Sequence, residues 1–164
     1  MKLVIQLKYL LGSIGLMIID PMQCQTTEMT NEIIHQLLLG NSAEVKGQLG
    51  QWEAYVANQT VFVITAENFN RMRIISPITE DKELSAEDMK VLLEANFDRA
   101  LDSKYSIYNG YLWSTFTHPL KELTDAQFVD ALQQVVTLAN NFGTTYRSTD
   151  LMFGGSGQQE SDQK

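Results

Sequence analysis

The segment KYSIYNGYLWSTFTH, residues 104–118, reads as a β-hairpin and decides the fold class. The Asn109-Gly110 dipeptide at its centre is the one favoured in two-residue type I′ turns. The aromatic and β-branched residues on either side favour strands, which we predict over 104–109 and 111–117. A two-residue loop also fixes the register, because only one pairing then closes the hairpin.

That register divides the aromatic residues between the two faces of the hairpin. The face better suited to a core carries Tyr105, Ile107, Leu112 and Phe116. The other face carries Lys104, Ser106, Tyr108, Tyr111, Trp113 and Thr115. A mixture of aromatic and polar side chains is typical of a surface that is partly exposed or covered by a partner.

Three more strand-like runs precede the hairpin, at 52–57, 60–66 and 71–76. The turns between them are predicted at 58–59 and 67–70, and Pro77 is predicted to end the last run. Such short connections indicate neighbouring antiparallel strands.

These three strands also have one apolar face and one mixed face. The predicted core face carries Trp52, Ala54, Val56, Val61, Val63, Met72 and Ile74. The mixed face carries Glu53, Tyr55, Phe62, Ile64, Arg71, Arg73 and Ile75. The glutamate and the arginines could form cross-strand ion pairs there, which contribute little at a surface.

Helical periodicity and capping residues predict three helices around the strands. The first runs from Thr27 to Leu39, and the second begins at Ser85. The third begins after Thr124 and stops at Gly143. The apolar stripe of the second helix is Met89, Leu92, Leu93 and Phe97. The connection over 40–50 is polar and contains glycine, so no strand is predicted there.

The order α-β-β-β-α-β-β-α predicts a single α+β domain over residues 26–143. We expect an antiparallel five-stranded sheet with the helices packed mainly on one face. Residues 144–164 have little apolar content and are predicted to be a disordered tail.

The first 25 residues are predicted to lie outside the domain. Lys2 and Lys8 precede an apolar run over 9–19, which matches the basic and apolar parts of a secretory signal. The competing interpretation is a misassigned start, with Met22 or Met29 as the true beginning. The run is too short to cross a bilayer, so no stable membrane span is expected once a signal is removed.

Charge and composition exclude several classes of function. The net charge of −8 argues against nucleic acid and anionic membranes as partners, because both would be repelled. One cysteine and two histidines are too few for a cysteine or histidine metal site. We find no nucleophile motif, phosphate loop or acid–base cluster, and therefore predict no cofactor, no metal and no enzymatic activity.

The mixed face is the strongest candidate for a binding surface. Three helices are too few to cover both sides of a five-stranded sheet, so one face is left open. The predicted partner-binding residues on it are Tyr55, Phe62, Ile64, Tyr108, Tyr111 and Trp113. The occupant is a protein client or a second copy of the chain. The alternative is that these side chains only stabilise the hairpin and its neighbours, as exposed cross-strand aromatic pairs do.

The second half of the chain resembles the type III secretion chaperone (CesT, or Tir chaperone) and YbjN-like superfamily. The resemblance rests on residues 92–143 and on NRMRIISPITE, residues 70–80. It covers a helix ending in Asn96-Phe97, the hairpin, Pro119-Leu120 and the capped helix that follows. The predicted order of elements agrees with that superfamily over about residues 28–143.

The resemblance implies a small, acidic, often dimeric protein without enzymatic activity, which binds an extended client segment on apolar patches. The secretion chaperones are cytosolic, whereas a genuine signal over 1–25 would place this chain in the periplasm or outside the cell. A small-ligand sensor or regulatory protein of the envelope, with a pocket lined by Trp52, is the alternative function. Without the signal, a cytoplasmic location is expected.

Overall fold

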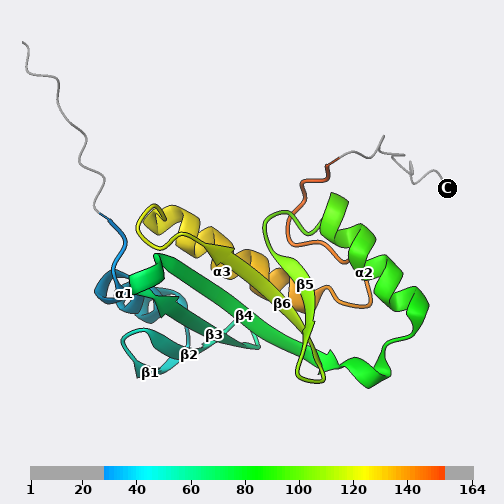
Figure 1. Cartoon of the computed structure of the whole chain (residues 1–164), viewed down its shortest axis with the longest axis horizontal. Coiled ribbons are helices and arrows are strands. Elements are labelled where there is room, and N and C mark those ends of the chain that lie inside the picture. Colours follow the sequence, from blue (N-terminus) through cyan, green and yellow to red (C-terminus); the bar gives the residue numbers. More distant parts are fainter. Residues whose placement is uncertain (1–27, 154–164) are drawn as a thin grey trace, which may run out of the picture.

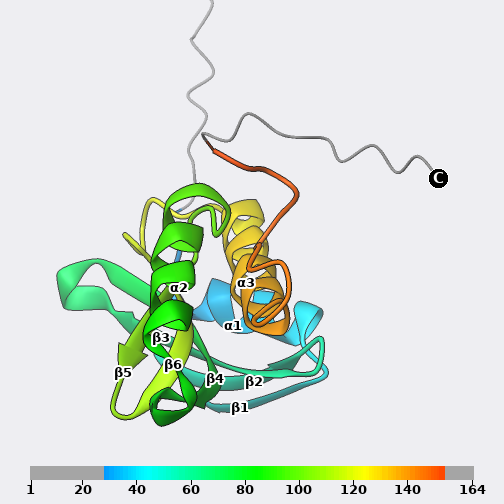
Figure 2. The same ribbon diagram turned by 90° about the vertical axis from the view of Figure 1, so that its right-hand side faces the viewer.

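In the computed structural model, residues 28–153 are described, and they form three helices on one six-stranded antiparallel sheet. The helices are α1 (Asn31–Asn41), α2 (Ala86–Asp98) and α3 (Asp125–Asn140). The strands are β1 (Glu44–Gln48), β2 (Gln51–Val56), β3 (Gln59–Ala66), β4 (Arg71–Glu80), β5 (Lys104–Tyr108) and β6 (Tyr111–His118), with short 3₁₀ turns η1 (Glu67–Phe69) and η2 (Asp81–Glu83). The strand order is β1-β2-β3-β4-β6-β5. All three helices lie on the same side of the sheet (Figures 1 and 2).

The α+β class is therefore confirmed, with one strand more than predicted. The extra strand, β1, pairs with β2 through a two-residue turn at Leu49-Gly50. The sequence does not predict β1, because it lacks an alternation of apolar and polar residues: all of its side chains except the half-buried Val45 are exposed. Gly47 also lowers its strand propensity, yet a glycine is required there. Its φ is +106°, and an added Cβ would lie 2.3 Å from the carbonyl oxygen of Gln51.

One predicted turn and the predicted end of β4 are wrong, and neither error changes which face a side chain occupies. The β2–β3 turn is Ala57-Asn58, both with positive φ, one residue earlier than predicted. The β4 strand continues past Pro77 to Glu80, with a register shift between Pro77 and Thr79. The proline is tolerated because pairing with β3 has ended before it, so its missing N–H removes no bond on that side. The four-residue turn over 67–70 and the Asn109-Gly110 hairpin register are confirmed.

The helices begin where side chains satisfy their free N–H groups. The predicted capping boxes at Ser85 and Thr124 are both present, with Asp88 and Gln127 as the reciprocal partners. The hydrogen bonds from Ser85 lower the pKa of the Asp88 carboxyl below its ordinary value. Helix α1 begins at Thr30, whose hydroxyl accepts from the backbone N–H of Ile33.

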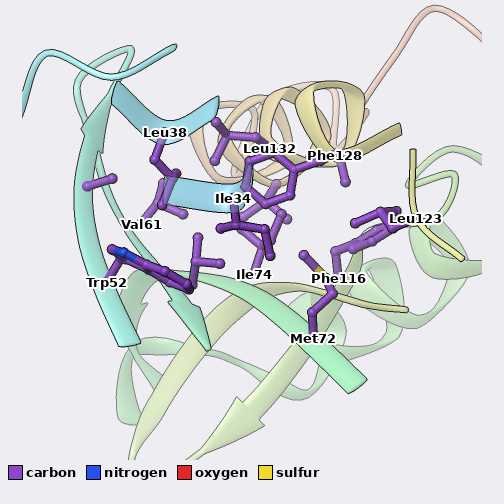
Figure 3. Packing of buried hydrophobic residues seen from close by; sticks show 14 of the residues in the cluster. Ile34, Leu38, Trp52, Val61, Met72, Ile74, Phe116, Leu123, Phe128 and Leu132 are labelled. Atoms are coloured by element: carbon purple, nitrogen blue, oxygen red, sulfur yellow. The ribbon is translucent and has the colours of Figure 1, made fainter. Parts of the chain in front are cut away.

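The main core lies between α1, α3 and the helix side of β2, β3, β4 and β6 (Figure 3). Its largest buried side chains include Ile34, Leu38, Val61, Met72, Ile74, Leu123, Phe128 and Leu132. The predicted core face of the first strands is confirmed, with Trp52 only 3% exposed. The Trp52 indole donates its N–H to His35 Nδ1 at 3.2 Å, which pairs the one polar atom that this residue brings into the core.

A second, smaller core lies between α2, β5, β6 and the end of α3. It contains Leu92, Ala95, Ala100, Tyr105, Leu112 and Leu138. The chain beyond Gly143 closes it, since Tyr146 packs edge-on against Tyr105 and Ser148 is buried. The disordered tail predicted from residue 144 is thus wrong up to Phe153, and residues 154–164 lie outside the described range. The predicted signal over 1–25 also lies outside it.

Tyr105 makes the second core less stable at alkaline pH. Its hydroxyl donates to the Leu138 carbonyl at 2.9 Å, and burial raises the pKa of the phenol well above its ordinary value. Folding therefore favours the neutral form of the Tyr105 phenol. Its contribution to the free energy of unfolding is complete below pH 10 and is progressively lost as the pH rises above that value. We expect the free energy of unfolding to fall above pH 10 by up to about 1.4 kcal/mol per pH unit from this residue. Urea titrations from pH 8 to 11 should show a shallower fall for Tyr105→Phe and an unchanged one for the exposed Tyr108→Phe.

Candidate functional site

The face of the sheet opposite the helices is open, and the strand registers arrange its side chains in rows. One row crosses all six strands and contains Lys46, Glu53, Phe62, Ile75, Thr115 and Lys104. The next row contains Gln48, Gln51, Ile64, Arg73 and Thr117. Apolar side chains from β3 and β4 therefore lie side by side at the centre of the face, with polar and charged side chains around them.

Two adjoining hollows lie on this open face. The first, of about 550 Å³, is lined by Phe62, Ile64, Ile75 and Trp113 together with Lys46, Gly47, Gln51, Trp52 and Glu53. The second, of about 380 Å³, is lined by Arg73, Ile75, Ser106, Ile107, Tyr108, Trp113, Thr115 and Thr117. They share Ile75 and Trp113, so together they form a continuous apolar surface across β3, β4, β6 and β5. We call this surface the sheet groove.

Trp113 lies where the two hollows meet and is held in place by the hairpin. Its indole N–H donates to the Tyr108 carbonyl at 3.0 Å. The Tyr111 ring packs edge-on against it, with 6.3 Å between ring centroids. The face of the indole is thereby presented in one orientation, which lowers the entropic cost of a contact with a partner.

The structure brings together four of the six predicted partner-binding residues. Phe62, Ile64, Tyr108 and Trp113 line the sheet groove. Tyr55 and Tyr111 are exposed on the same face, at 43% and 42%, but line neither hollow. Ile75 is the residue that the list of predicted carriers missed. Its place on the mixed face follows from the alternation in RMRIIS, and it is the side chain common to both hollows next to Trp113.

Ile107 does not belong to the core, contrary to the prediction. Its side chain is 47% exposed, whereas Tyr105, Leu112 and Phe116 are buried as predicted. The alternation is correct, but β5 is an edge strand, and no element covers its end. Ile107 therefore lines the sheet groove on one side and the hollow under α2 on the other.

The apolar stripe of α2 is the second exposed apolar surface. Only Leu92 of the stripe is buried, and Met89, Leu93 and Phe97 are 39%, 70% and 83% exposed. These three residues follow each other at four-residue spacing along one side of the helix. We call them the α2 row. A hollow of about 210 Å³ separates α2 from β5, lined mostly by apolar side chains of the two elements.

The side chain of Asn96 partly closes the edge of β5, because it makes the backbone hydrogen bonds that a neighbouring strand would make. The amide of Asn96 accepts from the Tyr105 backbone N–H at 2.7 Å and donates to the Tyr105 carbonyl at 3.1 Å. Lys104 Nζ donates to the Asn96 carbonyl in the last turn of α2 and to the Leu101 carbonyl in the loop that follows. These bonds tie α2 to the hairpin and satisfy the outward backbone groups of Tyr105, which would otherwise pair with another strand.

Polar side chains beside α3 are engaged in structural bonds. Residues 28–153 contain no group of three or more His, Cys, Asp or Glu side chains that would hold a metal ion. A polar hollow of about 390 Å³ beside α3 is lined by Asp102, His118 and Asp130, among others. There His118 Nδ1 lies 2.7 Å from the Pro119 carbonyl oxygen, and Asp130 accepts from the Gln134 amide.

Two solved structures share this architecture. A chain of the HopA1–SchA chaperone–effector complex superposes with a TM-score of 0.52 at 13% identity, covering 68% of this chain and 94% of that one. A chain of the ExsC–ExsE complex superposes with a TM-score of 0.51 at 12% identity, covering 66% and 90%. This chain has a type III secretion chaperone-like fold. The fold implied by the sequence resemblance is thereby confirmed, while its YbjN-like part stays a prediction.

Comparison by sequence adds no relative. No family model matches the chain, and no curated protein matches it. Within residues 28–153, no helix has both the length and the apolar composition needed to cross a membrane.

Proposed function

We propose that this protein is a chaperone-like binding module without enzymatic activity, which holds an extended segment of a client protein in the sheet groove. The observation that carries the proposal is the continuous apolar surface around Phe62, Ile75 and Trp113 on the face that no helix covers. Exposed apolar surfaces of this kind, surrounded by polar groups, usually mark protein interfaces. The fold shared with chains of a chaperone–effector complex supports the same function.

The proposal is tested with a phage-displayed library of random dodecapeptides, because the client is unidentified. We expect the full chain to enrich peptides with alternating apolar residues, since an extended peptide presents every second side chain to the sheet. Ile64→Lys places a charge in the groove and should weaken binding of the enriched peptides more than tenfold. Leu93→Lys, an equal change of an exposed apolar residue on α2, is the control and should leave binding unchanged. Loss of binding in Leu93→Lys alone, or no enrichment at all, would contradict the proposal.

The α2 row favours a second interaction, self-association into a homodimer. A single row of apolar side chains along one helix is self-complementary under two-fold symmetry, because each helix then covers the row of the other. The double substitution Leu93→Lys/Phe97→Lys should convert a dimer into a folded monomer, since both side chains are largely exposed and contribute little to the monomer core. Light scattering after size-exclusion chromatography measures this. A wild-type monomer, or a dimer that survives the double substitution, would exclude the α2 row as a dimer interface.

The small-ligand sensor is less well supported by the geometry. That function called for a cavity lined by Trp52 and convergent polar groups between helix and sheet. On the helix side of the sheet, the Trp52 ring packs among core side chains such as Val61 and Ile34 (Figure 3), and the hollow that Trp52 lines is on the open face instead. The periplasmic or secreted location, with cytoplasm as the alternative, stays a prediction. N-terminal sequencing of the native protein tests it, because a start near Thr26 would show export.

A further inference from the structure

Arg73 is a cation without an acidic partner in the sheet groove of an acidic protein. The ion pairs that the sequence allows between Glu53 and the two arginines of β4 do not form. Among residues 28–153, neither Arg71 nor Arg73 forms a salt bridge. The other cation that lines the groove, Lys46, is paired with Glu44 at 3.0 Å. Arg73 is thus the exposed cation in the groove that is left to pair with a ligand.

The guanidinium of Arg73 is also held in a defined position. Its Nε donates to the Thr117 hydroxyl at 3.1 Å, across the β4–β6 pair. This bond uses one of the five N–H groups, and the structure assigns no acceptor to the terminal ones. A positioned guanidinium with free terminal N–H groups suits a carboxylate, which accepts two parallel hydrogen bonds from it.

The distance between Arg73 and Trp113 defines the spacing of the side chains that a bound peptide would need. The β4–β6 register pairs Arg73 with Thr117, Ile75 with Thr115 and Pro77 with Trp113. One end of the hollow of about 380 Å³ is therefore cationic, its middle is apolar, and its other end is aromatic. The ends are four residues apart along β6, or about 13 Å. An extended peptide lying along the strands would present side chains at the same spacing, two residues at a time.

We propose that the client segment carries an acidic residue four positions from a large apolar residue, with a smaller apolar residue between them. The carboxylate pairs with Arg73, the central side chain lies over Ile75, and the large side chain contacts Trp113. This inference rests on the proposed function, because it names the chemistry of the client in the same groove. Arg73 is then the specificity-determining residue of the site, and Trp113 supplies most of the apolar contact.

The net charge of −8 does not oppose such a client. Charges separated by more than about 8 Å are largely screened at physiological ionic strength. Glu53 is the acidic side chain that lines the sheet groove, and it lies on β2, two strands from β4. That lateral separation is about 10 Å. The field at the Arg73 end of the groove is therefore set by Arg73 itself.

The test repeats the dodecapeptide selection with three full-length proteins, namely wild type, Arg73→Glu and Arg71→Glu. Wild type should enrich Asp or Glu four positions from Phe, Leu, Ile or Trp. Arg73→Glu should enrich Lys or Arg at that position and bind the wild-type peptides about tenfold or more weakly. Arg71→Glu makes the same charge change on the neighbouring exposed residue, which lines neither hollow, and should keep the acidic preference. Arg73→Gln, a milder second variant in case Arg73→Glu does not fold, should lose the acidic preference without gaining a basic one.

The outcomes separate this inference from the proposed function. Apolar peptides that need Ile64 but show no acidic preference, or a preference that Arg73→Glu and Arg73→Gln leave unchanged, would overturn the acidic client and keep the groove as the binding site. No enrichment by wild type would overturn both. A preference that reverses in Arg71→Glu as well would show a general charge effect and would also overturn the role of Arg73.

Discussion

Gln134→Leu is expected to lower the free energy of unfolding by about 2 to 3 kcal/mol. Gln134 lies on α3 and is only 1% exposed. Its Oε1 accepts from the backbone N–H groups of Asp102 and Ser103, at 3.1 and 3.3 Å, and its amide donates to Asp130 at 2.7 Å. Leucine fills a similar volume but accepts no hydrogen bond. The N–H of the fully buried Ser103 would then be left without a partner, which is the costly part of the change.

The loop that Gln134 holds leads directly into β5, so the substitution also tests how far the stability of the β5–β6 hairpin depends on this loop. Urea unfolding monitored by circular dichroism measures the loss, and hydrogen exchange of the β5 amides shows whether it is centred on the hairpin. Gln133→Leu is the matched control, since the neighbouring glutamine is exposed, and it should change stability by less than about 0.5 kcal/mol. Equal losses in both variants would mean that the buried amide has no special role.

Trp113→Ala is expected to weaken binding of the selected peptides about 30-fold, or about 2 kcal/mol. Tryptophan side chains in central, partly desolvated positions are the usual hot spots of protein interfaces. Trp113 lines both hollows of the sheet groove and is oriented by its bond to the Tyr108 carbonyl. Isothermal titration calorimetry with one enriched peptide measures the change.

Two controls separate a lost contact from a damaged hairpin. Trp113→Phe removes the indole hydrogen bond but keeps an aromatic ring, so its affinity should fall only a few-fold. Tyr111→Ala removes the ring that packs against Trp113 without touching either hollow, so its affinity should fall much less than that of Trp113→Ala. If Tyr111→Ala weakens binding as much as Trp113→Ala, the aromatic residues act through hairpin stability, as exposed cross-strand pairs do.

The sequence predicts most of the fold because its strongest signals are local. The Asn109-Gly110 turn fixes the register of β5 and β6 within one short segment, and the capping boxes fix the starts of α2 and α3. The alternation in β2, β3 and β4 predicts correctly which side chains face the core. Strand β1 carries no such signal, because its side chains are nearly all exposed and Gly47 interrupts the pattern.

The exposed surfaces are harder to predict than the core. Periodicity shows that α2 has an apolar side, but not whether another element covers it. Helix α2 meets the sheet only at its narrow edge, beside β5, so Leu92 and Ala95 are buried and the α2 row is not. The same edge exposes Ile107. The sequence also does not show that Arg73 lacks an acidic partner, because that depends on the register, which places Ile64 opposite Arg73 and Phe62 opposite Glu53.

The central claim is that a client segment lies in the sheet groove, and photo-crosslinking tests it most directly. An enriched peptide carrying benzoylphenylalanine in place of its large apolar residue is irradiated with the full chain, and the linked residues are identified by mass spectrometry. Cross-links at Trp113, Tyr108 or Ile75, reduced by excess unmodified peptide, are the predicted result. Cross-links concentrated at Leu93 and Phe97 on α2 would contradict it and would place the client on the helix instead.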